Sequence, residues 1–125
     1  MKRFIPFLAL LVFTTYACSD DDDNAPQPCT DEVAPALKVI VVNAATAATL
    51  GAGITVTATD GTYIDELDYV AEVNEFRGAD ERAGTYIVTV TGTGYDPYVS
   101  QPVTVTEDEC HVLTQTVNVA LQPAD

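Results

Sequence analysis

The side chains that could carry chemistry in this sequence are three cysteines, one histidine and several groups of acids. The cysteines are Cys18, Cys29 and Cys110, and the only histidine, His111, directly follows the third. Thiols and imidazoles can act as nucleophiles, bases and zinc ligands, whereas carboxylates bind calcium or transfer protons. If the chain is exported, an odd number of cysteines leaves one that needs a role of its own.

Cys110 and His111 could form a thiol–imidazole pair, because a neighbouring imidazole can lower the pKa of a thiol. Adjacent strand residues, however, point to opposite faces of a sheet. The parity of the apolar residues that follow places His111 on the apolar side, near a strand end. We therefore expect His111 to be a partly buried structural residue, and we predict no catalytic residue.

The acids outside the N-terminal segment gather near turn signals, which is typical of solvated surface. The groups are Asp65, Glu66 and Asp68, then Asp80 and Glu81, then Glu107, Asp108 and Glu109. A weak calcium site in one of these loops is the alternative. Paired acids of a glycosidase would need an aromatic cleft, but there is no tryptophan. The aromatic candidates for a carbohydrate surface are Tyr63, Tyr69, Tyr95 and Tyr98.

The first seventeen residues have the pattern of a targeting segment. Lys2 and Arg3 precede an apolar run from Phe4 to Phe13, and the small Ala17 stands before Cys18. A run of this length is too short to cross a bilayer, which takes about 20 residues. It fits the hydrophobic region of a signal peptide, predicted at residues 1–17.

This segment also resembles a bacterial lipoprotein signal, in which cleavage leaves a lipidated cysteine as the first mature residue. The resemblance rests on Ala17-Cys18 after the apolar run, and an ordinary secretory signal is the alternative. It implies lipid on Cys18 and leaves Cys29 and Cys110 as a pair. In an oxidising compartment these two would form a disulfide, with two free thiols as the alternative. One histidine and two bridged cysteines do not make a four-ligand zinc site, so we predict no metal and no cofactor.

Residues 18–32 are expected to form an extended acidic tether. Asp20 to Asp23 repel one another and the prolines at 26 and 28 stiffen the chain. Its ten residues 19–28 reach at most ~35 Å. The aspartate run resembles the surface-export signal of Bacteroidetes lipoproteins, and a plain spacer is the alternative. Calcium is disfavoured, because Ala25 stands where an EF-hand register begun at Asp20 requires glycine.

The charge of the predicted mature chain excludes several partners. Loss of residues 1–17 leaves three basic against 19 acidic side chains, a formal charge of −16. Such a surface does not favour nucleic acid or anionic lipid. Attachment to a membrane would therefore need the covalent lipid or a protein partner at the cell envelope.

From residue 33 to 125 the sequence predicts an all-β fold. Apolar and polar residues alternate over 54–59, 85–91, 103–106 and 113–121, as in strands with one face on a core. The run 37–43 is apolar at both parities and predicts a strand buried on both sides. Glycine turns separate these segments, and residues 64–77 are predicted as strand and loop. The prediction is a small antiparallel two-sheet sandwich of six to seven strands.

Two stretches resemble the carboxypeptidase regulatory-like domain, an immunoglobulin- or transthyretin-like β-sandwich. They are "VVNAATAATLGAGITVTATDGTY" from residue 41 and "ERAGTYIVTVTGTGYDPY" from residue 81. Members of that family are mostly non-catalytic modules. Together, the lipoprotein-signal resemblance and this domain resemblance imply a non-enzymatic lipoprotein at the outer membrane, on its periplasmic face or the cell surface, with a binding or structural role. The alternative is an accessory subunit that binds carbohydrate or peptide in an uptake or adhesion complex.

Overall fold

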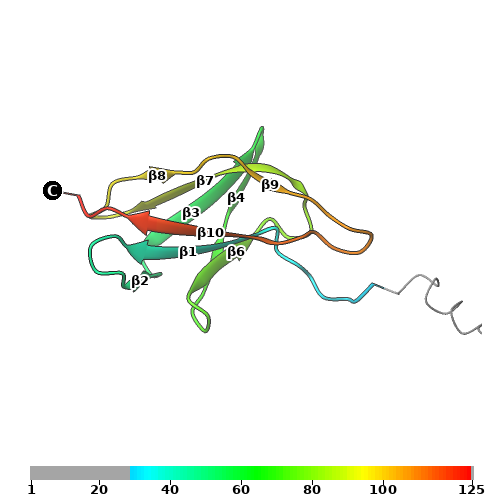
Figure 1. Cartoon of the computed structure of the whole chain (residues 1–125), viewed down its shortest axis with the longest axis horizontal. Coiled ribbons are helices and arrows are strands. Elements are labelled where there is room, and N and C mark those ends of the chain that lie inside the picture. The colour runs from blue at the N-terminus through cyan, green and yellow to red at the C-terminus, as the bar shows by residue number, and fades with distance from the viewer. Residues whose placement is uncertain (1–28, 125) are drawn as a thin grey trace, which may run out of the picture.

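Ten strands, arranged in two facing sheets, build the part of the chain that the computed structural model describes, residues 29–124 (Figure 1). They are β1 (Leu37–Asn43), β2 (Thr49–Leu50), β3 (Ile54–Asp60), β4 (Tyr63–Glu66), β5 (Asp68–Val70), β6 (Glu75–Gly78), β7 (Gly84–Gly92), β8 (Tyr98–Val99), β9 (Val103–Val105) and β10 (Gln115–Leu121). The predicted all-β two-sheet sandwich is confirmed. The predicted count of six to seven strands is too low, because six of the ten have four residues or fewer and give little alternation.

The first sheet has the order β10-β1-β6-β5, and β2 pairs with β1. Its pairs are antiparallel except for β1 and β10, which run parallel from Leu37 opposite Gln115 to Asn43 opposite Leu121. The last strand therefore lies beside the first. This pairing places the segment before β1 next to the loop before β10, and both belong to the candidate site.

The second sheet has the order β4-β3-β7-β8, and β9 also pairs with β7. Along β3 and β7 the predicted alternation is confirmed. Val56 and Ala58 are buried opposite Val90 and Val88, whereas the threonines between them are exposed or half-buried. The β-branched threonines suit this position, since they favour extended backbone and tolerate water.

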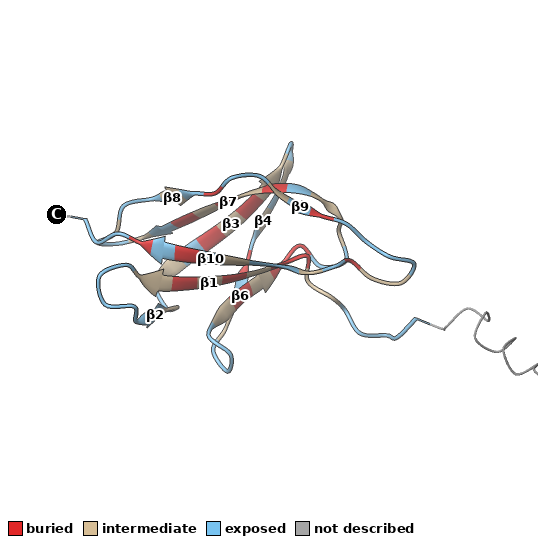
Figure 2. Ribbon diagram, viewed as in Figure 1, coloured by how far each residue is buried: buried red, intermediate tan, exposed pale blue. Residues whose placement is uncertain are grey.

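The core lies between the two sheets, and Figure 2 shows buried and less buried residues alternating along the long strands. Its largest fully buried side chains are Tyr86, Leu37, Leu121, Val39, Val41, Val56, Val88, Val90, Val105 and Val119. The prediction for 37–43 is wrong for one face. Ile40 and Val42 of β1 are only half-buried, because nothing in the described residues covers the outer side of this sheet.

Residues 62–83 form strands and turns, as predicted for 64–77. β4 pairs with β3 in one sheet, whereas β5 pairs with β6 in the other, so the chain changes sheets at Leu67. Leu67 is buried, and its N–H donates to the carbonyl of Val56 at 2.8 Å. Gly78 and Gly84 are among the glycines that the sequence predicts to form turns, but they instead end β6 and begin β7. Strands of three or four residues that switch sheets explain why no clear period was visible.

The described chain is elongated, and its two ends differ (Figure 1). The segment before β1, the loop before β10 and the start of β1 lie at one end. The β1–β2 turn, the β7–β8 turn and the C-terminal residues lie at the other. Among residues 29–124 there is no helix with the length and apolarity needed to cross a membrane.

Candidate functional site: the disulfide end

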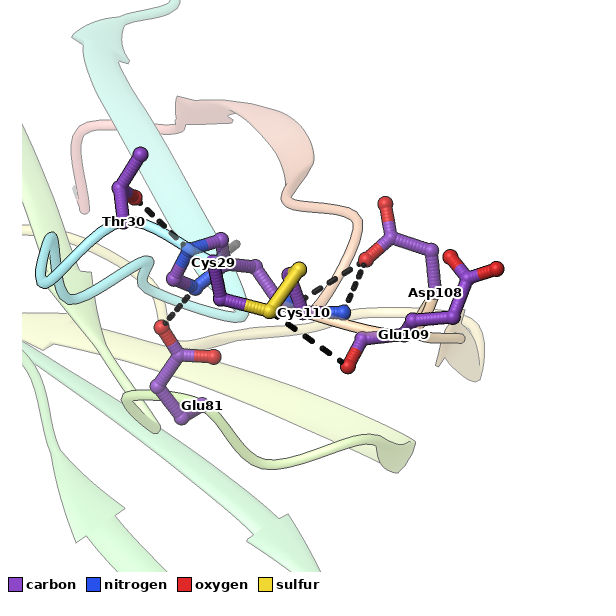
Figure 3. Close-up of a disulfide and its surroundings, with 7 residues drawn as sticks. Cys29, Thr30, Glu81, Asp108, Glu109 and Cys110 are labelled. Atoms are coloured by element: carbon purple, nitrogen blue, oxygen red, sulfur yellow. Dashed lines mark hydrogen bonds and ion pairs between the residues drawn. A yellow bond between two sulfur atoms is a disulfide. The ribbon is translucent and has the colours of Figure 1, made fainter. Parts of the chain in front are cut away.

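The cluster here called the disulfide end comprises Cys29, Thr30, Glu81, Asp108, Cys110 and His111 (Figure 3). Cys29 and Cys110 form a disulfide with their Cα atoms 5.2 Å apart, across 81 residues of chain. The predicted pairing is thereby confirmed. The bridge joins the segment before β1 to the loop between β9 and β10. The parallel pairing of β1 with β10 brings these two segments to the same end of the sandwich.

Glu81 connects a third segment, the loop between β6 and β7, to the same cluster. Its backbone N–H donates to the carbonyl of Ala34, and its Oε2 accepts from the N–H of Ala34, both at 2.8 Å. The backbone of Glu81 has a φ of 54°, a value that residues other than glycine rarely adopt. The bonds to Ala34 hold Glu81 in this conformation. The bond from the Ala34 N–H to Oε2 also stabilises the charged carboxylate, and together with the bond from His111 it keeps the pKa of Glu81 below its usual range.

His111 lies between Glu81 and Thr30. Its Nδ1 is 2.7 Å from Oε2 of Glu81 and its Nε2 is 3.0 Å from Oγ1 of Thr30. A carboxylate only accepts, so Nδ1 carries the donated proton. The side chain is 25% exposed, which fits the predicted partly buried histidine. It lies in a bend before β10 and not on the strand, so its orientation comes from the loop and not from strand parity.

Asp108 shapes the loop that carries Cys110 and His111. Its Oδ1 accepts from the backbone N–H groups of both residues at 2.9 Å, and its own N–H donates to the carbonyl of His111 at 2.9 Å. The N–H groups of His111 and Cys110 hold the pKa of Asp108 below its usual range. The Asp108 side chain thus fixes the position of both the disulfide and the imidazole.

The order carboxylate, imidazole, hydroxyl is the order of a hydrolase triad. A triad also needs free donors for a developing oxyanion. The nearest backbone donors in this loop, those of Cys110 and His111, already bind Asp108. The surrounding hollow of about 500 Å³ is acidic, so it opposes a second negative charge. It is lined by Thr30, Glu32, Val33, Glu81, Glu107, Asp108, Glu109, Cys110 and His111. The engaged backbone donors and the acidic surroundings therefore favour a structural role for Glu81, His111 and Thr30 over acyl transfer.

Metal binding gains no support at this end. Over residues 29–124, no three of the histidine, cysteine and acidic side chains are placed to hold one ion. Both cysteines are engaged in the disulfide. The EF-hand-like register begun at Asp20 lies outside the described residues, as do the segment 1–17 and Cys18.

The four tyrosines proposed as an aromatic surface do not come together. Tyr63 is on β4 and Tyr69 on β5, at edges of different sheets, whereas Tyr95 and Tyr98 lie at the β7–β8 turn. All four pack partly against the core. Tyr69 donates to Asn74 at 2.9 Å, and Tyr95 accepts from Asn43 at 3.1 Å. Tyr69 and Tyr95 thus hold turns in place, as expected of tyrosines that cap a core.

The sequence did not identify Thr30, Glu81 or Asp108 as members of one site. Cys29 and Cys110 were found by counting cysteines, but Glu81 and its partners Ala34 and His111 are 47 and 30 residues apart. No local motif signals such contacts. A comparison with protein-family models gives no match, and a comparison with curated proteins gives none either.

Proposed function

We propose that this chain is an exported lipoprotein, anchored in the outer membrane through lipid on Cys18, with a non-enzymatic binding or structural sandwich. The observation that carries the proposal is the Cys29–Cys110 bridge. Disulfides persist in oxidising compartments outside the cytoplasm. With these two cysteines paired, Cys18 is the one left over in the sequence, and it follows the signal-like segment directly.

The geometry of the disulfide end supports a tethered module. Cys29 lies within the segment 18–32 proposed as the tether, and its disulfide with Cys110 bonds that segment to one end of the sandwich. The bridge, Glu81 and His111 make this attachment firm. The turns at the opposite extremity are then directed away from the anchor, where a partner can reach them.

We infer further that the sandwich is of the carboxypeptidase regulatory-like kind. The first quoted stretch covers the end of β1, β2 and β3, and the second covers β7 and the turn to β8. In the second, Gly84-Thr85-Tyr86 begins β7 and directs the Tyr86 ring into the core. This supports a module whose role is binding or structural.

An accessory subunit that binds carbohydrate or peptide is the second candidate. The dispersed tyrosines disfavour a glycan, since a stacking platform needs aromatic rings on one surface. The edge of β10 that no strand within residues 29–124 pairs favours a peptide, because such an edge offers backbone hydrogen bonds to an extended chain.

Fractionation of a Cys18→Ala variant in an outer-membraned bacterium tests the anchor. We expect the wild-type chain to sediment with membranes until detergent is added, and the variant to be found in the soluble exported fraction. Protease treatment of intact cells then distinguishes the surface from the periplasmic face. A wild-type chain in the cytosol, or a variant that still sediments with membranes, would overturn the proposal.

A further inference from the structure

β10 presents a free edge to solvent. Among residues 29–124 the only strand that pairs with it is β1. Gln115 donates to Ala36, and Leu121 accepts from Ala44. Odd-numbered residues of β10 therefore bond to β1, so the N–H and C=O groups of the even-numbered ones point away from it. Those residues are Thr116, Asn118 and Ala120, and all three are exposed.

The two ends of this edge are closed, and its middle is open. Beyond β10, the carbonyl of Gln122 accepts from Asp96 at 2.9 Å, and Pro123 lies opposite Tyr95. Before β10, Leu113 donates to the carbonyl of Thr106 at 2.8 Å. The open part is thus a strip along the three even-numbered residues, which has the length of a short added strand.

β10 lacks the devices that protect the other edges. Exposed edges are usually shortened or carry charges or prolines. β5 has three residues and begins with an aspartate, β4 contains Asp65 and Glu66, and β8 and β9 are short and adjoin prolines. β10 has seven residues, "QTVNVAL", with no charge and no proline. Of these edges, β10 is therefore the best prepared to accept another strand.

Apolar surface lies beside this edge. A groove of about 140 Å³ on the outer side of the sheet is lined by Ile40, Val42, Asn118, Val119 and Ala120. Ile40 and Val42 are the half-buried residues of β1 on the face for which the sequence predicts burial. A strand added at β10 can place side chains against this groove.

The charge of the described residues indicates what kind of segment the edge of β10 would bind. The described residues contain three lysines and arginines against 14 acids, and each of the three is paired, Lys38 and Arg77 with Glu75, and Arg82 with Asp60. A second copy would bring two strongly acidic molecules together. The loop that leads into β10 carries Glu107, Asp108 and Glu109, all exposed. A basic segment would therefore be attracted to this end of the strand.

We propose that β10 binds an extended segment of a partner protein as an added antiparallel strand. Lysine or arginine at the segment's C-terminal end lies beside the loop 107–109. Antiparallel pairs are the more stable per residue, and this direction brings the partner's C-terminal end to the start of β10. The proposal rests on the binding role proposed above and identifies its surface and the chemistry of its partner.

The test uses a synthetic probe and the full mature chain. The probe is a peptide of three valine–threonine pairs followed by three lysines, and the matched probe ends in three glutamates. We expect the lysine peptide to slow hydrogen exchange at the amides of Thr116, Asn118 and Ala120 by about tenfold or more. We expect no slowing with the glutamate peptide. Raising the salt from 0.05 to 0.5 M should weaken binding of the lysine peptide.

Two variants separate strand pairing from general attraction. Asn118→Pro removes a donor on the free side of β10, where edge strands tolerate proline, and should abolish the slowing. Asn118→Ala keeps the N–H and should preserve it. If the proline variant does not fold, the double variant E107Q/E109Q should still lower the affinity for the lysine peptide while leaving the backbone unchanged.

Several results would overturn the proposal. These are lysine-peptide binding without slowed exchange on β10, no binding at millimolar peptide, or a dimer through β10 that excludes the peptide. None of these results depends on where the chain is located. A chain found lipid-anchored but unable to bind the probe would refute the edge site alone. A cytosolic chain that binds it would refute the anchor alone.

Discussion

At the scale of single residues, Tyr86 links the start of β7 to the loop before it. Its ring is fully buried, and its hydroxyl donates to the carbonyl of Arg82 and accepts from the Arg82 guanidinium at 3.2 Å. A tyrosine bonded to the backbone a few residues upstream recurs in β-sandwiches. The same guanidinium lies 3.8 Å from the ring centre of Tyr63 and pairs with Asp60 at 3.0 Å. Tyr86 thus fixes the point where the β6–β7 loop enters β7, and Arg82 links it there to Tyr63 and Asp60.

Replacing Tyr86 by phenylalanine should lower the free energy of unfolding by about 1–3 kcal/mol, because the Arg82 carbonyl loses its partner. Tyr98→Phe is the matched control, since no hydrogen bond of the Tyr98 hydroxyl occurs within residues 29–124. It should change stability by less than about 0.5 kcal/mol. Urea unfolding of both variants measures the difference. Equal effects would show that the Tyr86 hydroxyl stabilises nothing.

Glu81 and Asp108 give the disulfide end a dependence on acid. Both have a pKa held below its usual range by bonds to backbone N–H groups. A carboxyl with a lower pKa in the folded state stabilises that state above the unfolded value, near pH 4, and loses this effect as the pH falls through the folded value. The stabilising effect is therefore present at neutral pH and is lost below about pH 4.

Thermal unfolding between pH 6 and pH 3 tests this dependence. Relative to wild type, the variant Glu81→Gln/Asp108→Asn should show a smaller loss of stability on acidification. Glu72→Gln, in the exposed β5–β6 turn, is the control and should follow the wild-type curve. Comparison with the wild type at each pH removes the general relief of repulsion among the other acids. Parallel curves for all three proteins would contradict the role given to Glu81 and Asp108.

At the scale of elements, alternation located the strands wherever one face is buried and the strand is long. β3 and β7 were predicted from their threonines and valines because both are central in their sheet and half-covered. The prediction that β1 is buried on both faces was wrong for one of them, since Ile40 and Val42 line the open groove beside β10. The short strands β4, β5 and β6 could not be separated, because the chain changes sheets at Leu67 within a few residues.

The candidate site was predictable only in its cysteines. Counting them led to the Cys29–Cys110 bridge, whereas Glu81 depends on contacts between a loop and two distant segments. The free edge of β10 is likewise a property of sheet order. Its neutral sequence resembles any strand until β1 is known to be its only strand partner among the described residues.

Removing the bridge by Cys29→Ser/Cys110→Ser should lower the free energy of unfolding by about 4 kcal/mol, because it frees a loop of 81 residues in the unfolded chain. Reduction of the wild-type protein should produce the same loss. Chemical unfolding of the three samples provides the comparison. A loss below about 1 kcal/mol in both would mean that Glu81 and His111 hold the segments without help from the disulfide.

At the scale of the whole molecule, residues 29–124 form a strongly acidic sandwich whose N-terminal segment is bonded at one end by the Cys29–Cys110 disulfide. The formal charge of −16 on the predicted mature chain opposes contact with anionic lipid, so membrane attachment would depend on the proposed lipid on Cys18. Cys29, the described residue nearest in sequence to the proposed anchor, belongs to the disulfide end, and the free edge of β10 runs from that end toward the opposite turns (Figure 1). A partner strand along β10 would therefore extend away from the proposed anchor.

Intact-mass spectrometry of the membrane fraction tests the central claim most directly. We expect a chain that begins at Cys18, carries an acyl-lipid adduct, and lacks the two hydrogens that the Cys29–Cys110 bridge removes. An unmodified chain that begins at Met1, with all three thiols open to alkylation, would contradict it.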